Sequence, residues 1–246
     1  RHSAYLLAAY NTIMLKIVGG KLLAAEAYAR DVLEITETNR WQHVAGAGFI
    51  QGILAIVLYE QFRLPEALDA VDSAIEILRS NQTYSYLGIA LCERARILFA
   101  QGEAERARYD LRFARRVARE HRIQRAELRA EVVEQRAELR AGNLAAATAR
   151  QASGLIPPLP EEGALNERQE LLLIEWAYLQ LAEGRSDNAL LQRLETCLAG
   201  ARASGRSSSG QDRTSSSSMC STSARTWNFS ARSCRRWRAR WAKASP

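Results

Sequence analysis

An internal repeat of about 40 residues, within the range of helical-repeat proteins, constrains the fold of this chain more than any other feature. Each repeat has a turn position, and an alanine follows it five positions later. The turn positions recur at nearly equal intervals and are Gly20, Phe62, Gly102, Gly142 and Gly184. The alanines are Ala25, Ala67, Ala107, Ala147 and Ala189. A regular period of this length, with apolar residues recurring at spacings of three and four, indicates a solenoid of helical hairpins.

The residues around each turn explain how one hairpin would form. A large apolar residue stands three positions before each turn and would close the first helix against the second; these are Ile17, Tyr59, Phe99, Leu139 and Leu181. The repeated alanine would let the two helix axes approach closely. Glycine at the turn adopts the positive φ that ends a helix. Phe62 replaces this glycine in the second repeat, where we expect Pro65 to open the second helix instead.

The pattern predicts an all-α fold, a right-handed superhelix of five helical hairpins that occupies residues 1–205. The expected helices are 3–18, 21–37, 41–61, 65–79, 83–101, 104–121, 123–141, 144–153, 165–183 and 187–204. The prolines within 156–160 exclude helix interior there, so this segment is expected to connect the fourth and fifth hairpins.

The net charge of the chain comes from its tail, residues 206–246. The 246 residues carry 34 Lys and Arg against 27 Asp and Glu, for a formal charge of +7. The tail holds nine of these basic residues and one Asp, which leaves 25 basic and 26 acidic residues in 1–205. The repeat region is therefore not a globally basic nucleic-acid-binding domain. No run of eighteen apolar residues occurs that would span a membrane.

The start of the chain and its cysteines suggest its context. Arg1 begins the sequence without Met or a signal peptide, so we interpret the chain as a fragment of a longer cytoplasmic protein. The four cysteines show no metal-ligand spacing, which favours a reducing compartment. Cys92 and Cys197 are expected to be small buried apolar residues.

Three segments together resemble a known family. They are LAIVLYEQFRLPEALDAVDSAIEIL (54–78), ARILFAQGEAERARYDLRFARRVARE (95–120) and AYLQLAEGRSDNALLQRLETCLAGARASGR (177–206). Their turn chemistry is that of tetratricopeptide repeats, although the period is longer than the usual one of about 34 residues. In order and spacing they resemble the tetratricopeptide-like domain of MalT-like, LuxR-family ATP-binding transcription regulators, over residues 1–206.

The resemblance implies a sensor domain without catalytic activity. Regulators of this kind combine an ATPase, such a helical domain and a LuxR-type helix-turn-helix. The chain contains no GxxxxGK[ST] motif and no recognisable helix-turn-helix after residue 206, so ATP is expected only in a separate N-terminal domain and no DNA contact is expected here. The family implies inducer binding and self-association or a partner protein. The alternative is a generic tetratricopeptide interaction scaffold unrelated to transcription.

The tail, residues 206–246, differs in composition from the repeat region and contains twelve Ser and eight Arg. Our hypothesis is that it is a frameshifted reading of one more hairpin. The single codons of Trp and Met support this, because Met219–Cys220 forces Val and Trp241–Ala242 forces Gly in the shifted frame. The alternatives are a disordered Ser/Arg-rich arm and a nucleic-acid-binding arm, in which Arg235, Arg236, Arg238 and Arg240 alternate with Trp237 and Trp241.

The candidate binding residues lie on the first helix of each hairpin, because these helices line the concave surface in tetratricopeptide-like packing. They are Tyr59, Arg96, Arg136, Trp176, Tyr178 and Trp41. Arg96 and Arg136 are one full repeat apart and occupy equivalent positions. Guanidinium and aromatic groups suit a sugar, another polar small molecule or an acidic peptide. The competing interpretations are hairpin core for Tyr59, pairing with Glu for the arginines, and a hydrophobic staple for Trp41.

No catalytic or metal-binding constellation is predicted. The three histidines, His2, His43 and His121, fall on different expected elements, and His121 stands at a helix C-terminus, where a histidine commonly interacts with the helix dipole. Glu131, Glu134 and Glu138 have the spacing of a solvated helix face paired with Arg.

Overall fold

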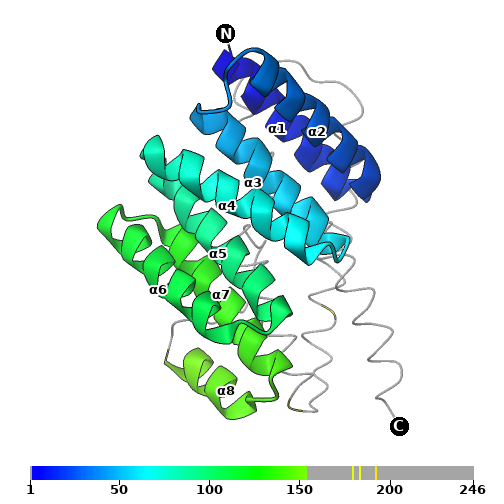
Figure 1. The fold of residues 1–246 in the computed structure, drawn as a ribbon. Coiled ribbons are helices and arrows are strands. Elements are labelled where there is room, and N and C mark those ends of the chain that lie inside the picture. Colours follow the sequence, from blue (N-terminus) through cyan, green and yellow to red (C-terminus); the bar gives the residue numbers. More distant parts are fainter. Residues whose placement is uncertain (1, 154–178, 180–182, 184–191, 193–246) are drawn as a thin grey trace. The chain divides into compact units, whose positions relative to one another are not determined.

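The computed structural model describes residues 2–153 together with residues 179, 183 and 192. The described residues form eight α-helices and no strand, which confirms the all-α helical-repeat prediction (Figure 1). The helices are α1 (His2–Val18), α2 (Leu22–Thr38), α3 (Ala45–Glu60), α4 (Leu64–Ser80), α5 (Tyr84–Gln101), α6 (Ala104–Glu120), α7 (Gln124–Arg140) and α8 (Leu144–Ala152). The chain divides into two compact units, residues 1–137 and residues 138–246.

Seven of these helices begin and end within one residue of the prediction, and the helix expected at 41–61 is the exception. That helix, α3, begins at Ala45, so the predicted start at Trp41 is wrong. The backbone N–H of Trp41 donates a hydrogen bond to the carbonyl of Thr36 and thereby closes α2. Residues 41–44 form a turn instead of a helical first turn. The helices expected at 165–183 and 187–204, the 156–160 connection and the tail 206–246 lie outside the described residues, apart from single positions.

All seven turns between the described helices use one backbone device. The residue at the turn has positive φ, and the N–H of the next residue donates to a carbonyl five positions back, as in the Schellman motif. The turn residues are Gly20, Arg40, Phe62, Gln82, Gly102, Arg122 and Gly142. Phe62 itself adopts φ 63°, so its turn closes as the glycine turns do, and Pro65 lies in the first turn of α4. The regular spacing of these turns gives α1 to α7 their nearly equal lengths of 16–18 residues.

The repeated alanines are buried where the structure describes them, as close packing of two helices requires. Within the described residues Ala25, Ala67, Ala107 and Ala147 are fully buried. In the first unit α3 also packs on α1 and α2 of the hairpin before it, and α5 packs on α3 and α4. This packing produces one continuous core from Leu6 in α1 to Val133 in α7.

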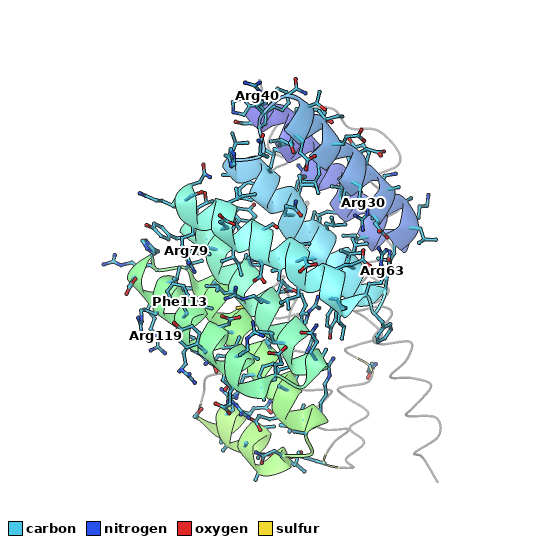
Figure 2. All side chains as sticks on the ribbon, in the orientation of Figure 1. Arg30, Arg40, Arg63, Arg79, Phe113 and Arg119 are labelled. Atoms are coloured by element: carbon cyan, nitrogen blue, oxygen red, sulfur yellow. The ribbon has the colours of Figure 1, made fainter. Side chains whose placement is uncertain are left out.

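Close helix contacts in the first unit depend on small residues. A β-carbon at Gly46 in α3 would stand 2.8 Å from Cβ of Leu6 in α1, and one at Gly88 in α5 would stand 2.9 Å from Cβ of Ala126 in α7. Side chains of the second helices extend over the neighbouring hairpin, and Arg79 of α4 lies 5.7 Å from the ring centroid of Phe113 in α6 (Figure 2). None of the described helices is both long and apolar enough to cross a membrane.

Candidate functional site

The first helices of three successive hairpins bring a polar cluster together. Tyr59 lies near the end of α3, and Arg96 lies in α5 with only 7% of its surface exposed. The Arg96 guanidinium carbon stands 4.1 Å from the centroid of the Tyr59 ring, which is a close cation–π contact. The structure therefore places two of the predicted site residues in direct contact.

Glu93 is the acidic centre of this cluster. Arg96 lies three residues after it in α5, and Nη2 of Arg96 is 2.7 Å from Oε2 of Glu93. Arg129 of α7 reaches the same carboxylate, and its Nε donates to Oε1 of Glu93 at 2.8 Å. On the other side Nη1 of Arg96 is 3.8 Å from Oε1 of Glu60 in α3. The Arg–Glu cluster, defined as Tyr59, Glu60, Glu93, Arg96, Arg129 and Arg136, thus connects α3, α5 and α7.

The charges of the cluster keep the buried Glu93 ionised. Burial raises the pKa of Glu93, but the positive charges of Arg129 and Arg96 lower it by more, so the pKa falls below its ordinary value. Arg136, half-buried and seven residues after Arg129 in α7, lowers the pKa of Glu93 further. The charge of Glu93 in turn raises the pKa of Arg129. A partly desolvated set of guanidinium groups around one carboxylate can bind carboxylate or hydroxyl groups of a ligand.

The remaining predicted site residues are placed differently. Trp41 lies in the turn before α3, where its ring is 5.7 Å from the ring of His2 and 6.4 Å from that of Tyr5, centroid to centroid. These contacts hold the beginning of α1 against the α2–α3 turn. Trp41 thus lies before the start of α3, whereas Tyr59 of the Arg–Glu cluster lies near the end of that helix. Trp176 and Tyr178 lie outside the described residues.

Glu93, Glu60 and Arg129 were missed by the sequence prediction. The signal that could have found Glu93 and Arg129 is a charged residue at a position where the neighbouring hairpins carry apolar residues. Ile53 in α3 and Val133 in α7 are the buried equivalents of Glu93. A second group that was missed is aromatic: Phe49 of α3 stacks on Tyr86 of α5 at 4.0 Å between centroids, and Tyr10 of α1 meets both edge-on.

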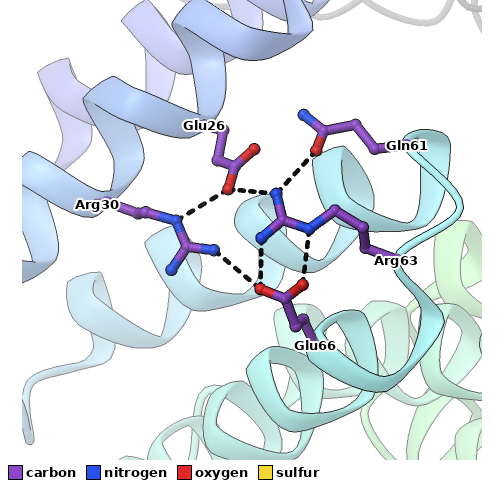
Figure 3. A network of polar contacts seen from close by, with 5 residues as sticks. All are labelled: Glu26, Arg30, Gln61, Arg63 and Glu66. Atoms are coloured by element: carbon purple, nitrogen blue, oxygen red, sulfur yellow. Dashed lines mark hydrogen bonds and ion pairs between the residues drawn. The ribbon is translucent and has the colours of Figure 1, made fainter.

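A second charged network joins the first two hairpins (Figure 3). Arg63, in the α3–α4 turn, donates from Nη1 to Oε1 of Glu26 in α2 at 2.7 Å and from Nε to Oε1 of Glu66 in α4 at 2.6 Å. Arg30 of α2 bonds the same two carboxylates, at 2.9 Å and 3.3 Å. Gln61 adds a hydrogen bond accepted from Arg63 at 3.1 Å.

The pKa shifts in this network reflect its pairing. Burial raises the pKa of Glu26, but hydrogen bonds from Arg30 and Arg63 lower it by more. The hydrogen bond from Arg63 lowers the pKa of Glu66. Arg30, Arg63 and Glu66 are substantially exposed, so their ion pairs add little stability. The network instead helps to fix the position of the first hairpin relative to the second.

The described residues offer little for covalent chemistry. Cys92 is fully buried, as expected, and burial raises the pKa of its thiol to about 12, so it is a poor nucleophile. No group of three or more His, Cys, Asp or Glu side chains within the described part of the chain is arranged to hold a metal ion. The three histidines lie on separate elements, and the ring of His121 stacks on Tyr84 at 3.8 Å.

Successive helical hairpins of nearly equal length, one repeated turn and a polar cluster on the first helices define the class of tetratricopeptide-like helical repeats, which are typically non-catalytic scaffolds. Within this class the family can be named. The family model described as the MalT-like TPR region matches residues 1–215, and the chain belongs to this family. Neither the curated proteins nor the solved structures yielded a match to this chain.

Proposed function

We propose that this chain is the sensor and assembly domain of a MalT-type transcription regulator, without catalytic activity of its own. It binds a small inducer or a protein partner in the cytoplasm, and it relays this binding to an ATPase and a LuxR-type DNA-binding domain elsewhere in the regulator. Membership of the MalT-like family supports the regulator context. DNA is contacted through the DNA-binding domain and not through this chain.

The observation that carries the sensor role is the position of the Arg–Glu cluster. Tyr59, Arg96 and Arg136 come from the first helices of three consecutive hairpins, which is the face that tetratricopeptide-like domains turn toward their ligands. A ligand with carboxylate or clustered hydroxyl groups competes with Glu93 for the arginines. Once Arg96 moves toward such a ligand, the Tyr59 ring becomes available as a stacking surface for a sugar or another planar group.

The same cluster supplies a route for the relay. Glu93 pairs with Arg96 of its own helix and with Arg129 of α7, and Arg96 also contacts Glu60 of α3. The cluster therefore helps to hold three hairpins together. A ligand that binds one arrangement of these hairpins better than another shifts their population by its difference in affinity. The attached domains then respond to the change in the helical repeat.

Isothermal titration tests this site. A panel of a neutral trisaccharide, a dicarboxylate and an acidic peptide is titrated into the chain and into its Arg96→Ala and Arg136→Ala variants. The ligand that binds the unaltered chain is expected to lose about tenfold or more in affinity with each variant, as for the loss of a charged hydrogen bond. Arg119→Ala is the matched control, because Arg119 of α6 is 66% exposed and pairs with Glu127 of α7, outside the Arg–Glu cluster.

Unchanged affinity in both cluster variants contradicts the site, and loss of affinity in Arg119→Ala shows a general charge effect instead. Melting followed by circular dichroism separates a binding defect from misfolding. The generic-scaffold alternative is distinguished by the flanking gene, since a scaffold unrelated to transcription has no reason to be joined to an ATPase and a helix-turn-helix.

A further inference from the structure

The outer face of α1 is apolar and exposed to solvent. Leu7 and Leu15 expose 51% and 63% of their surface. Ala4 and Ala8 on the same face of the helix are exposed as well, and Asn11, between Ala8 and Leu15, is half-buried. Large apolar residues gathered on one exposed helix face call for an explanation, whereas a single exposed leucine would not.

The equivalent face of the later first helices in residues 1–137 is buried or half-buried. Counted from the turn residue of each hairpin, Leu15 corresponds to Val57 in α3 and to Ile97 in α5, which are 0% and 1% exposed, and to the half-buried Ala137 in α7. Ala8 corresponds to Ile50, Ala90 and Ala130, which are all buried. The face of α1 thus has the residue types of an inter-hairpin interface at the same positions, without the hairpin that covers them elsewhere.

The preceding hairpin is what covers this face in the later repeats. Gly46, the counterpart of Ala4, packs against Leu6 of α1, and Ala126, its counterpart in α7, packs against Gly88 of α5. Leu6 and Gly88 are themselves equivalent positions, each at the same distance in sequence before its own turn. The α1–α3 and α5–α7 pairs therefore meet in one register. Ala4 occupies the position at which α1 would contact a preceding first helix in the same register.

We propose that the outer face of α1 is the docking face for a further helical hairpin of the same repeat, encoded immediately ahead of Arg1 in the same polypeptide. The register favours this occupant over a second copy of the chain. The contact joins two different positions, that of Gly46 on one helix and that of Leu6 on the other. A two-fold dimer places the exposed α1 face against itself, and Leu6 is already buried against α3, so a dimer cannot reproduce this pairing. A solenoid that ended at α1 would carry polar residues on this face.

Cysteine accessibility tests the proposal, with Leu23 as the matched control. Leu23 is 78% exposed, and its equivalents Pro65 and Glu105 are exposed in their hairpins, so this position faces solvent in each repeat. Leu15→Cys and Leu23→Cys are made in the present chain and in the chain extended by about one repeat of upstream coding sequence. Labelling by N-ethylmaleimide is followed at the level of single peptides, which separates the introduced thiols from the native ones.

The two thiols are expected to label at similar rates in the unextended chain. In the extended chain the labelling rate of Leu15→Cys is expected to fall by about tenfold or more, while that of Leu23→Cys stays the same. Equal labelling of Leu15→Cys in both chains overturns the proposal. Protection in the unextended chain that grows with protein concentration also overturns it, because a second copy then covers the face. A reading frame that opens less than one repeat ahead of Arg1 overturns it without further experiment.

Discussion

Four of the seven turns between the described helices place a residue with a side chain in the left-handed region. Arg40, Phe62, Gln82 and Arg122 have φ between 53° and 63°, where glycine stands in the other three turns. A β-carbon in this region costs about 1–2 kcal/mol, because it approaches the following carbonyl oxygen. The repeated hydrogen-bonding pattern of the turn is strong enough to hold these residues there.

Replacing Phe62 by glycine is therefore expected to stabilise the chain. Phe62 is 78% exposed, so little apolar burial is lost. Phe62→Gly should raise the free energy of unfolding by about 1 kcal/mol in urea denaturation, because the strain at φ 63° is relieved. Gly102→Ala is the reciprocal variant: its β-carbon meets no atom within 4 Å, so its expected loss of about 1 kcal/mol comes from the backbone alone. A loss of stability in Phe62→Gly would contradict this account of the turn.

Glu93 should make stability depend on pH. Its pKa in the folded chain lies below the value of about 4.3 in the unfolded chain. The stability from its ionised form is therefore complete above the unfolded pKa and is lost as the pH falls through the folded pKa. Glu93→Gln should cost about 3 kcal/mol at pH 7, because Arg96 and Arg129 lose a buried counter-charge.

The difference between the unaltered chain and Glu93→Gln should shrink as the pH is lowered from 5 toward the folded pKa of Glu93. Urea unfolding at several pH values measures it. The other paired carboxylates are present in both proteins, so their titration cancels in the difference. A difference that stays constant between pH 7 and the acid limit of folding would show that Glu93 is not held ionised by its arginines.

Glycine and alanine determine how closely neighbouring helices approach one another. Gly88 of α5 stands against Ala126 of α7, where a new β-carbon would be 2.9 Å from an existing one. Gly52 of α3 is the opposite case, since a β-carbon there would stand 3.8 Å from Cβ of Ala74, an ordinary contact. Both glycines lie within helices, so the two positions differ mainly in the space around them.

Gly88→Ala should therefore lower the free energy of unfolding by about 1–3 kcal/mol, because α5 and α7 must move apart. Gly52→Ala should leave it unchanged or raise it by up to about 1 kcal/mol, since alanine is the better helix former. Thermal and urea melts of the two variants measure the contrast. If both substitutions had the same effect, close packing at Gly88 would not be what holds the helices in register.

The helices and their turns were predictable because each obeys a local rule. Apolar spacing and turns at regular intervals placed seven helices within one residue of their bounds. The start of α3 was missed because Arg40, a residue without a turn signal, adopts positive φ and lets Trp41 cap α2. The sequence predicted the break after residue 37, but no local signal showed that residues 41–44 form a turn before α3 begins.

The site was predictable only in part, for a reason of geometry. The repeat period places Tyr59, Arg96 and Arg136 on corresponding helices, and the structure pairs the first two. The partner of Glu93 is Arg129, which lies four positions short of one full repeat away. This offset depends on how one hairpin is shifted along the next, which is a property of the packed interface and not of any single repeat.

For the whole molecule, the positive charge and the helical repeat belong to different parts of the sequence. The formal charge of +7 comes from the tail, which lies outside the described residues, whereas several charges of the first unit are paired within or between hairpins. Arg94 bonds Asp72 and Asp110, and Arg115 bonds Glu131. The frameshift explanation of residues 206–246 stays a hypothesis, and it predicts a sixth hairpin in another reading frame.

The nucleotide sequence of the gene on both sides of this segment tests the central proposal, a sensor domain within a MalT-type regulator, most directly. The proposal predicts a GxxxxGK[ST] motif of an ATPase upstream and a helix-turn-helix coding segment downstream, reached in one frame once the shift near codon 206 is corrected. A gene with no phosphate-binding motif upstream, and with no helix-turn-helix in any downstream frame, would contradict it.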